Sequence, residues 1–500
     1  METIRIRKLS HANLGIECED DLSAELREFF SFFVPGYKFM PAFRKRLWDG
    51  KIRLFDSRTG QLPAGLYSHV YNFAKNRGYD LHLLESDYGL PGDTFDVDPE
   101  ELYHWIKTLR MPYKIRDYQF DALMHAIKNK TGILVSPTGS GKSLIIYCLV
   151  RYYHEVLSYY NHVYKGDKKV LIIVPTTSLV EQMFEDFRSY GPELGIESYC
   201  HKIYSGKDKN SDCGCFISTW QSIYKLPFDW FEQFGMVIGD ECHGFKAKSL
   251  TSIMNKSTEA EYRYGTTGTL DGTQTHELVL QGLFGKVFKV TTTKKLQESD
   301  TLAELNINRI ELEYTDKVKK EFGKKEYQEE IEFIVSNEKR NKFIKNLALD
   351  LKGNTLVLYN YVEKHGKPIF ELIDNNSAER KVFFVSGQTD TNDREAIRKI
   401  IEKQKNAIIV ASLGTFSTGI NIRNLHNIIF ASPSKSQIRV LQSIGRGLRK
   451  SDNNVPTELY DIIDNISWMS RKNFAYTHAE ERLKIYNKEK FNHKTYKVDI

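Results

Sequence analysis

The chain contains 500 residues, of which 41% are hydrophobic and 27% are charged, and its formal net charge is +6. This length predicts about three domains, and the composition is typical of a soluble globular protein. No segment approaches the roughly 18 to 20 apolar residues of a membrane span, which excludes an integral membrane protein. Residues 1–7 lack a secretory signal, and the six cysteines are too few for a disulfide framework, so we expect a cytoplasmic protein.

Residues 1–100 are expected to form a separate amino-terminal α+β domain. Between residues 37 and 58, seven basic residues outnumber two acidic ones and alternate with aromatic residues. Asp49-Gly50 predicts a β-hairpin turn within this segment. Because cations pair with phosphates and rings stack on bases, the segment predicts nucleic-acid contacts by Arg44, Lys45, Arg46, Trp48 and Lys51. The alternative is that the aromatic residues fill a small core while the charges are solvated.

Short apolar runs alternate with helix-length segments from residue 131 onward, which is typical of parallel sheets buried on both faces. The runs fall into two groups that carry different motifs. We therefore predict two successive α/β domains, over residues 101–300 and 301–465. Residues 466–500 are basic and helix-forming in composition, and we expect a short helical tail there.

Residues 136–143 follow an apolar run and precede a helical stretch, which is the context of a phosphate-binding loop. Glycines let backbone N–H groups turn around phosphates, and the helix amino terminus adds its dipole. Lys142 would reach the β and γ phosphates of ATP, and Ser143 would offer its hydroxyl to Mg²⁺. The predicted ATP-binding residues are Pro137, Thr138, Gly139, Ser140, Gly141, Lys142 and Ser143. The usual pattern opens with glycine, whereas Ser136 stands here, and the alternative is a chance Gly/Ser turn.

A second motif, Asp-Glu-Cys-His at residues 240–243, directly follows the apolar run at residues 236–238. Its two carboxylates therefore project from the end of a buried strand. Asp240 is the predicted Mg²⁺ ligand, and Glu241 is the predicted base that orients the attacking water. The alternative is that both carboxylates are solvated at a strand end.

A third motif at residues 442–449 presents Arg446 and Arg449, three residues apart on one predicted helix face. Guanidinium groups stabilise the charge that develops on a transferred phosphoryl group, so both arginines are predicted catalytic residues. The alternative is a solvated basic helix face.

With these motifs in order, residues 113–464 resemble superfamily 2 helicases, which implies two tandem RecA-like lobes. The resemblance implies that Gln119 contacts adenine and that Gly419 lies in a nucleotide motif. It implies strand-tracking contacts, to phosphates rather than bases, by Pro175, Thr176, Thr219 and Thr415. Coupling between the lobes is implied for His243, Thr267, Thr269 and Gln442. Thr267-Gly268-Thr269 stands where the family often has Ser-Ala-Thr.

The Asp-Glu-Cys-His box, residues 414–424 and the Trp48-Asp49-Gly50 segment resemble the UvsW-type recombination helicases of T-even-like phages. This likeness implies an ATP-dependent and Mg²⁺-dependent DNA helicase that acts on forks, Holliday junctions and RNA–DNA loops. The choice of DNA rests on the likeness, so an RNA-remodelling helicase and an ATP-switched nucleic-acid-binding protein remain alternatives. A monomer is expected, with DNA as its partner and with recombination or single-strand-binding proteins as further partners.

Overall fold

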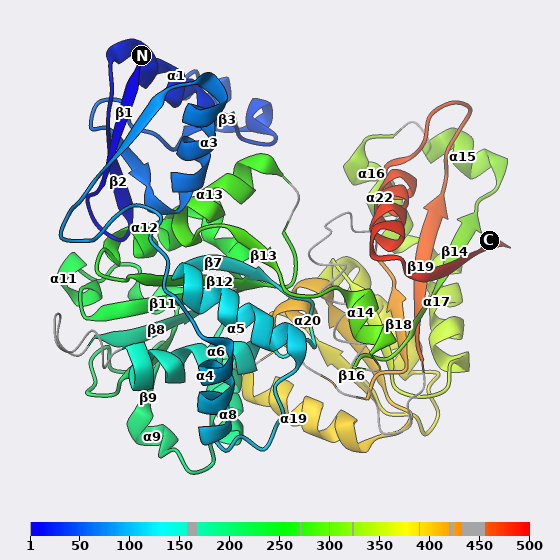
Figure 1. Cartoon of the computed structure of the whole chain (residues 1–500). Coiled ribbons are helices and arrows are strands. Elements are labelled where there is room, and N and C mark those ends of the chain that lie inside the picture. Colours follow the sequence, from blue (N-terminus) through cyan, green and yellow to red (C-terminus); the bar gives the residue numbers. More distant parts are fainter. Residues whose placement is uncertain are drawn as a thin grey trace. The chain divides into compact units, whose positions relative to one another are not determined.

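The computed structural model describes residues 2–157, 168–270, 273–299, 301–322, 325–389, 391–419, 422, 424–432 and 456–500. The chain divides into two compact units (Figure 1). The first unit comprises Met1–Ser136 and Gly141–Val290, and the second comprises Thr291–Ile500 together with Pro137–Ser140. The division falls shortly before the boundary predicted near residue 300. Within the described ranges, no helix has the length and apolar character needed to cross a membrane.

The amino-terminal domain is an α+β domain built on a four-stranded sheet with the order β5-β2-β1-β6. In β1, Ile4 and Ile6 are fully buried and alternate with arginines, which is the pattern of a strand with one buried face. Helices α1 and α3 supply Leu26 and Phe73 to the same core. The elements of the sheet and its helices are β1 (Thr3–Lys8), β2 (Asn13–Glu17), α1 (Asp20–Phe29), β5 (Gln61–Pro63), η2 (Ala64–Leu66), α3 (Tyr67–Arg77) and β6 (Asp80–Leu84).

Residues 31–53 form a small substructure, here called the arm. It contains β3 (Ser31–Phe33), η1 (Tyr37–Phe39), α2 (Pro41–Arg44) and β4 (Lys51–Arg53), and β3 pairs with β4 in antiparallel register. The predicted hairpin turn at Asp49-Gly50 is therefore wrong. Pro41 starts a helical turn instead, since its fixed φ suits the first position of a helix. Arg44, Lys45 and Arg46 consequently lie on α2 and the turn after it, not on a β-ribbon.

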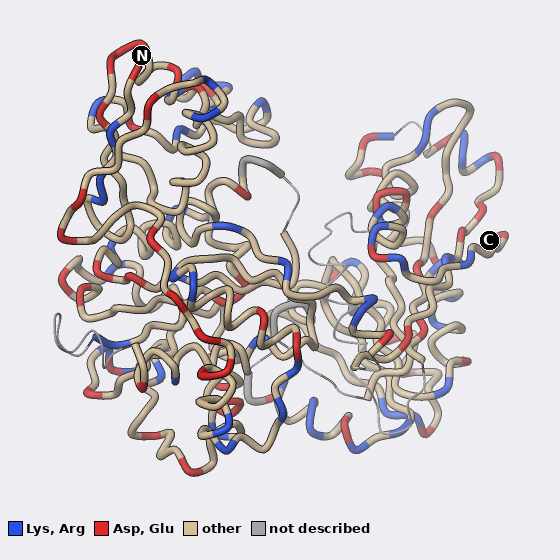
Figure 2. The backbone as a smooth tube through the Cα atoms, viewed as in Figure 1, with Lys and Arg blue, Asp and Glu red and all other residues tan. Residues whose placement is uncertain are grey.

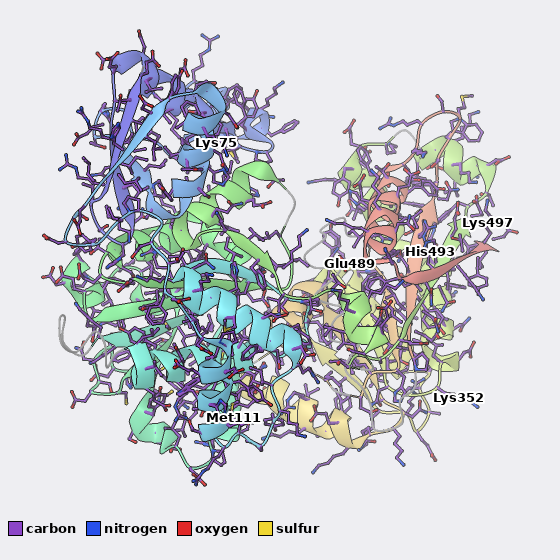
Figure 3. The ribbon with its side chains drawn as sticks, in the orientation of Figure 1. Lys75, Met111, Lys352, Glu489, His493 and Lys497 are labelled. Atoms are coloured by element: carbon purple, nitrogen blue, oxygen red, sulfur yellow. The ribbon has the colours of Figure 1, made fainter. Side chains whose placement is uncertain are left out.

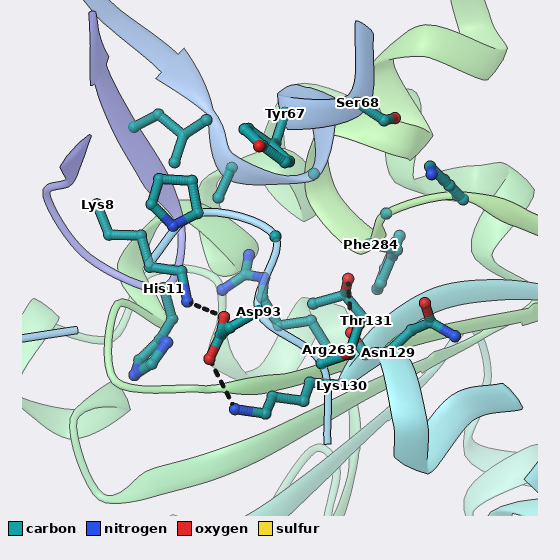
Figure 4. Close-up of a pocket in the computed structure, with 18 of the residues that line it drawn as sticks. Lys8, His11, Tyr67, Ser68, Asp93, Asn129, Lys130, Thr131, Arg263 and Phe284 are labelled. Atoms are coloured by element: carbon teal, nitrogen blue, oxygen red, sulfur yellow. Dashed lines mark hydrogen bonds and ion pairs between the residues drawn. The ribbon is translucent and has the colours of Figure 1, made fainter. Parts of the chain in front are cut away.

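An ionic chain through Asp93, in the segment that follows β6, joins the amino-terminal domain to the domain of the first seven-stranded sheet (Figure 4). Lys8 Nζ lies 2.7 Å from Asp93 Oδ1, and Lys130 Nζ lies 2.9 Å from Asp93 Oδ2. Lys130 also pairs with Glu261 at 2.8 Å. Burial favours the protonated carboxyl of Asp93, but the hydrogen bonds from Lys8 and Lys130 outweigh it and lower the pKa of Asp93. The chain borders a cavity of about 340 Å³ between the two domains.

The first sheet domain contains a seven-stranded parallel sheet with the order β13-β7-β12-β11-β8-β10-β9. Only β7, β8 and β11 were anticipated as apolar runs. Every residue of β11 is buried, as expected for a central strand covered on both faces. The strands are β7 (Thr131–Val135), β8 (Lys169–Val174), β9 (Cys200–Ile203), β10 (Cys215–Thr219), β11 (Phe234–Asp240), β12 (Tyr262–Thr267) and β13 (Val287–Lys289).

Helices connect these strands as parallel pairing requires. They are α4 (Pro99–Thr108), α5 (Asp117–Asn129), α6 (Lys142–Tyr152), η3 (Tyr153–Leu157), α8 (Thr177–Tyr190), α9 (Ile196–Tyr199), α10 (Trp220–Ile223), α11 (Phe228–Phe231), η4 (Cys242–Lys246), α12 (Lys248–Lys256) and α13 (Gln274–Phe284). Helix α13 also contacts the amino-terminal domain. There His69 Nε2 and Gln281 Oε1 lie 2.7 Å apart, and Leu278 joins the core of the amino-terminal domain.

The second unit contains another seven-stranded parallel sheet, with the order β16-β17-β15-β18-β19-β14-β20. Its strands are β14 (Leu305–Glu313), β15 (Thr355–Tyr359), β16 (Val382–Val385), β17 (Ile408–Ser412), β18 (Asn427–Phe430), β19 (Thr457–Asn465) and β20 (Asn492–Asp499). Its helices are α14 (Thr293–Glu298), α15 (Asp316–Phe322), α16 (Tyr327–Ser336), α17 (Glu338–Asp350), η5 (Val362–Gly366), α18 (Lys367–Asp374), α19 (Thr391–Lys403), α20 (Leu413–Gly419) and α22 (Phe474–Glu489). The two RecA-like lobes predicted from the sequence are thus confirmed.

The carboxyl-terminal segment contains the expected helix, α22, and also a strand for which its sequence has no signal. Glu489 ends α22, and His493 and Lys497 lie on β20 (Figure 3). Strand β20 pairs in parallel with β14 at the edge of the second sheet. Its polar sequence gave no strand signal, because an edge strand that is exposed along most of its length needs no apolar run.

Two buried ion pairs hold helices of the second unit to β19. Arg340 donates to Asp464 from Nε at 2.7 Å and from Nη2 at 3.0 Å, and Tyr314 Oη also donates to Asp464. Arg482 on α22 pairs in the same way with Asp461, with Nη2 2.6 Å from Oδ1. Both arginines are almost fully buried, so these hydrogen bonds offset the cost of removing four charged groups from water.

We expect Arg340→Met to destabilise the second unit by about 3 to 5 kcal/mol, because the substitution leaves the Asp464 carboxylate buried without its cation. The measurement is the denaturant midpoint at which β19 amides lose protection from hydrogen exchange in the full chain. Lys342→Met on the same helix is the control; its side chain is 64% exposed. That control should change stability by less than about 0.5 kcal/mol. Equal midpoints for the two variants would contradict the assignment.

Candidate active site

The predicted motifs of the first unit meet at one edge of its sheet. In parallel strands all carboxyl ends lie at the same edge. The register places Asp240 beside Thr266, and Thr267 beside Val135, so the ends of β11, β12 and β7 are neighbours. The phosphate loop follows β7 directly. The two remaining motifs of this unit, after β8 and β10, lie on the adjacent strands.

The phosphate loop has the backbone conformation that its glycines permit. Gly139 has φ +84° and Gly141 has φ +81°, values that other residues rarely adopt. Lys142 is the first residue of α6, and its Nζ donates to the Ser136 carbonyl at 3.1 Å. The N–H of Ser140 donates to the Pro137 carbonyl and tightens the turn. The loop therefore presents the amino terminus of an 11-residue helix and one ammonium group to a ligand.

Ser136 replaces the glycine of the usual pattern without strain. It is not among the residues with positive φ. Its N–H donates to the Thr267 carbonyl at 2.9 Å, so its backbone continues the pairing between β7 and β12. A small buried side chain fits there, and the departure from the pattern does not disturb the loop.

Gln119 and Ser143 make further contacts at the phosphate loop. Gln119 is buried on α5; its Oε1 accepts from the Arg116 N–H at 3.0 Å, and its Nε2 lies 3.5 Å from the Gly141 carbonyl. A Cβ at Gly141 would come within 2.4 Å of Nε2, so this contact requires glycine. Ser143 Oγ lies 2.8 Å from Tyr190 Oη, at the end of α8. The adenine role of Gln119 and the Mg²⁺ role of Ser143 stay predictions.

The two carboxylates at the end of β11 have different environments. Asp240 is buried, and Thr266 Oγ1 donates to its Oδ1 at 2.6 Å. Burial and then the charge of Glu241 raise the pKa of Asp240, while Lys142 and the Thr266 hydroxyl oppose that rise. Glu241 adopts φ +51°, which a non-glycine residue holds only at some cost. This conformation turns the chain from β11 into η4.

A polar chain links the Asp-Glu-Cys-His box to the end of β12. His243 Nδ1 lies 3.4 Å from Glu241 Oε2 and 3.0 Å from Thr267 Oγ1. Thr267 Oγ1 donates in turn to the Thr269 carbonyl at 2.9 Å. Oγ1 of Thr269 is buried and has no hydrogen-bond partner within the described ranges. The predicted coupling residues of this unit are therefore in direct contact with one another.

The predicted strand-tracking residues of the first unit lie at the ends of β8 and β10. Thr176 caps α8, with its side chain accepting from the Leu179 N–H at 3.4 Å. Thr219 is buried, and its hydroxyl bonds Ser222 Oγ at 3.0 Å. The Pro175 carbonyl accepts from Gln221 Nε2 at 3.3 Å. These hydroxyls thus have local partners, and the amino terminus of α8 is the group best suited to a phosphate.

In the second unit, Thr415 lies near the start of α20. Its N–H donates to Ser412 Oγ at 3.2 Å, and the Ser412 hydroxyl donates to Thr415 Oγ1 at 2.6 Å. Gly419 is the last residue of the same helix. Gln442, Arg446 and Arg449 lie outside the described residues, so their predicted roles stay predictions from the sequence.

Sequence reasoning missed two residues that the fold brings to this edge. Thr266 holds the Asp240 carboxylate, and Tyr190 bonds Ser143. A polar residue one position before the predicted Thr267 was a weak signal for the first. Nothing in the sequence marked Tyr190, because its contact depends on how α8 packs beside α6.

Three family models match separate parts of the chain. Residues 3–84 match the model described as DNA helicase UvsW, N-terminal. Residues 112–272 match Type III restriction enzyme, res subunit, and residues 338–451 match Helicase conserved C-terminal domain. The matches follow the amino-terminal domain and the two sheet domains in order.

The chain is 38% identical to the ATP-dependent DNA helicase uvsW of Enterobacteria phage T4, over 98% of both chains. The crystal structure of T4 UvsW matches with a TM-score of 0.50 and 35% identity, covering 99% of both chains. A fragment of a putative HsdR subunit of a type I restriction enzyme from Vibrio vulnificus YJ016 matches with a TM-score of 0.58. Its identity is 16%, with 87% of this chain and 83% of that chain covered, so this likeness shows the fold alone.

We expect Thr266→Val to move the acid limb of the kcat–pH profile of ATP hydrolysis upward by about one pH unit. The substitution removes a hydrogen bond to the charged form of Asp240, whose pKa then rises further, so ionisation requires a higher pH. Thr266→Ser keeps a hydroxyl and should restore the profile. An unchanged acid limb in Thr266→Val would show that Asp240 does not govern it.

Proposed function

The chain belongs to the UvsW family of ATP-dependent superfamily 2 DNA helicases, and we propose that it remodels branched DNA. The substrates we propose are replication forks, Holliday junctions and RNA–DNA loops, in recombination, repair and replication. One observation most supports the ATP-driven part of this proposal: the phosphate loop before Lys142, the Asp240 carboxylate and the His243–Thr267 chain lie at the ends of neighbouring strands of one sheet. The unit that carries this site also carries the amino-terminal domain with its basic arm.

For hydrolysis, we propose that the loop N–H groups and Lys142 bind the ATP phosphates. Lys142 Nζ donates to the Ser136 carbonyl, and a phosphate oxygen can take the place of that acceptor. Asp240 and Ser143 suit a hard cation such as Mg²⁺, which supplies positive charge to the phosphates when bound. Asp240 fits that role because it is a buried carboxylate at the end of β11; burial and then the charge of Glu241 raise its pKa, and a bound cation would favour its charged form. Glu241 then orients the attacking water and accepts its proton.

For coupling, we propose that the γ phosphate acts on Thr269 through the Glu241–His243–Thr267 chain. Glu241, which would position the water, contacts His243, and His243 contacts Thr267. Loss of the phosphate changes the charge beside Glu241 and so the bonding of this chain. The segment after Thr269 leads into α13, which packs against the amino-terminal domain.

DNA contacts are proposed at two places in the first unit. The amino terminus of α8 at Thr176, with Pro175 and Thr219 beside it, suits the backbone of a tracked strand. The arm adds Arg44, Lys45, Arg46 and Lys51. In the second unit, Thr415 is the residue that we propose contacts the tracked strand. We propose further that the protein acts as a monomer in the host cytoplasm, with recombination or single-strand-binding proteins as partners.

Lys142→Ala should lower DNA-stimulated ATP hydrolysis by about 10²-fold or more, because the developing phosphoryl charge loses its cation. The variant should also fail to process a panel of forks, four-way junctions and RNA–DNA loops, while its DNA affinity stays within about twofold of the wild type. Lys128→Ala, an exposed lysine on α5, is the control. Retained hydrolysis would contradict the site; stimulation by RNA but not by DNA would favour the RNA-remodelling alternative.

Arg44→Ala combined with Lys45→Ala should reduce the slope of log affinity against log salt by about 2, since each phosphate contact contributes about 0.9. The measurement is fork-DNA affinity at several salt concentrations. Arg27→Ala with Lys75→Ala is a matched control that removes the same charges from exposed positions on α1 and α3. Equal slopes for both double variants would contradict a role for the arm.

A further inference from the structure

Two apolar side chains of the arm are exposed to an unusual degree. Phe39, at the end of η1, is 75% exposed, and Leu47, after α2, is 79% exposed. Here they are called the tip. Phe33 and Met40 are also exposed, at 50% and 38%. Large apolar side chains gathered in one small element, beside cations, mark a surface that a ligand covers.

Contacts among other rings hold the arm together, although none of these rings is fully buried. Phe33 and Tyr37 stack with centroids 4.7 Å apart, and Phe43 meets Tyr37 edge-on at 4.8 Å. Gly50 packs against Tyr37 so closely that a Cβ there would lie 2.3 Å from the ring. The indole of Trp48 donates to the Lys51 carbonyl at 2.8 Å. Trp48, predicted from the sequence to stack on bases, is therefore engaged in holding the arm together.

The surroundings of the tip are cationic. A groove of about 610 Å³ is lined by Lys38, Phe43, Arg44, Arg46, Leu47, Trp48 and Asp49. The single carboxylate in that list is ionised but paired with Arg53, whose hydrogen bond lowers the pKa of Asp49 to about 2. In the described part of the chain, Lys38, Arg44 and Arg46 have no carboxylate within ion-pair distance. Figure 2 shows the lysines and arginines of this domain in blue.

We expect this surface to bind nucleic acid, a polyanion whose bases have apolar faces, rather than a protein. Lys38, Arg44 and Arg46 suit phosphates, and Phe39 and Leu47 suit the faces of bases. Apolar wedges that enter a base step unstack it, and this is least costly where pairing is already broken. A branch point offers such steps together with closely spaced phosphates. A partner protein with an acidic rim is the competing occupant, and the experiment below separates the two.

We propose that Phe39 and Leu47 form a strand-separating tip that inserts between bases at a DNA branch point. Lys38, Arg44 and Arg46 hold the flanking phosphates. This inference rests on the proposed function, because it names the part of the protein that meets the junction. The residues differ from the sequence prediction, in which Trp48 was the base-contacting aromatic.

The tip can transmit motion because its domain is fixed to the first sheet domain. Asp93 bridges Lys8 and Lys130, and His69 bonds Gln281 on α13. Gly65 on η2 approaches α13 so closely that a Cβ there would lie 2.0 Å from the Gln281 carbonyl oxygen. A side chain that separates strands needs a rigid connection between its domain and the first sheet domain. Force applied to a loosely attached domain would only rotate that domain.

The test uses forks and four-way junctions carrying 2-aminopurine at the branch point. Phe39→Ser with Leu47→Ser should lower the rate of strand separation at least tenfold and abolish the rise of 2-aminopurine fluorescence on binding without ATP. DNA-stimulated ATP hydrolysis should stay within twofold of the wild type. Phe39→Trp with Leu47→Met keeps apolar faces and should retain both signals. Tyr71→Ser with Leu83→Ser, which removes one exposed aromatic and one exposed aliphatic residue elsewhere in the domain, is the matched control.

The outcomes separate this inference from the proposed function. A wild-type protein that hydrolyses ATP but processes no branched DNA contradicts the proposed function, and the fluorescence rise on binding still reports on the tip. An active wild type with an equally active serine variant contradicts the tip alone. Unchanged fluorescence in the serine variant, with loss of binding to an acidic partner protein, would assign the surface to that partner instead.

Discussion

The parallel register of β12 between β7 and β11 is the constraint on which the site depends. It places the Thr267 carbonyl within reach of the Ser136 N–H and sets Thr266 beside Asp240. A glycine pair at the same level, Gly239 and Gly265, lets η4 fold back onto the sheet. A Cβ at Gly239 would lie 2.7 Å from Phe245, and one at Gly265 would lie 2.8 Å from the Cys242 sulfur. The close approach of η4 is what brings His243 to Thr267.

Buried carboxylates in the two units have opposite environments. Asp464 and Asp461 on β19 each receive several hydrogen bonds from a buried arginine, so their charge is compensated within the fold. Asp240 accepts hydrogen bonds from the Thr266 hydroxyl and from the backbone N–H of Glu241, and burial and the charge of Glu241 raise its pKa against the opposing effect of Lys142. Cys242, which follows Glu241, is buried, and burial raises the pKa of its thiol, so it stays neutral and packs as an apolar group.

The amino-terminal domain shows how one aromatic-rich segment divides between structure and surface. Tyr37, Phe43 and Trp48 make the arm a folded element, and Phe39 and Leu47 are left outside it. The alternative in which aromatic residues pack against one another thus holds for part of the segment, and its nucleic-acid contacts stay a prediction. The ionic chain through Asp93 and the packing on α13 then tie the arm to the sheet that carries the phosphate loop.

The sequence by itself determined the local motifs and the fold class. Glycines at 139 and 141, the carboxylates after an apolar run and the rhythm of buried strands are local signals, because each depends on residues next to one another in the chain. Tertiary structure alone decided the edge strands β9, β13 and β20, whose short or polar sequences become strands only by pairing with a neighbour. It also decided that Thr266 meets Asp240, that Tyr190 meets Ser143, and that Phe39 is 75% exposed while the Trp48 indole bonds the Lys51 carbonyl. Those contacts join residues far apart in sequence or depend on which rings a small core has room for, and no local pattern encodes that choice.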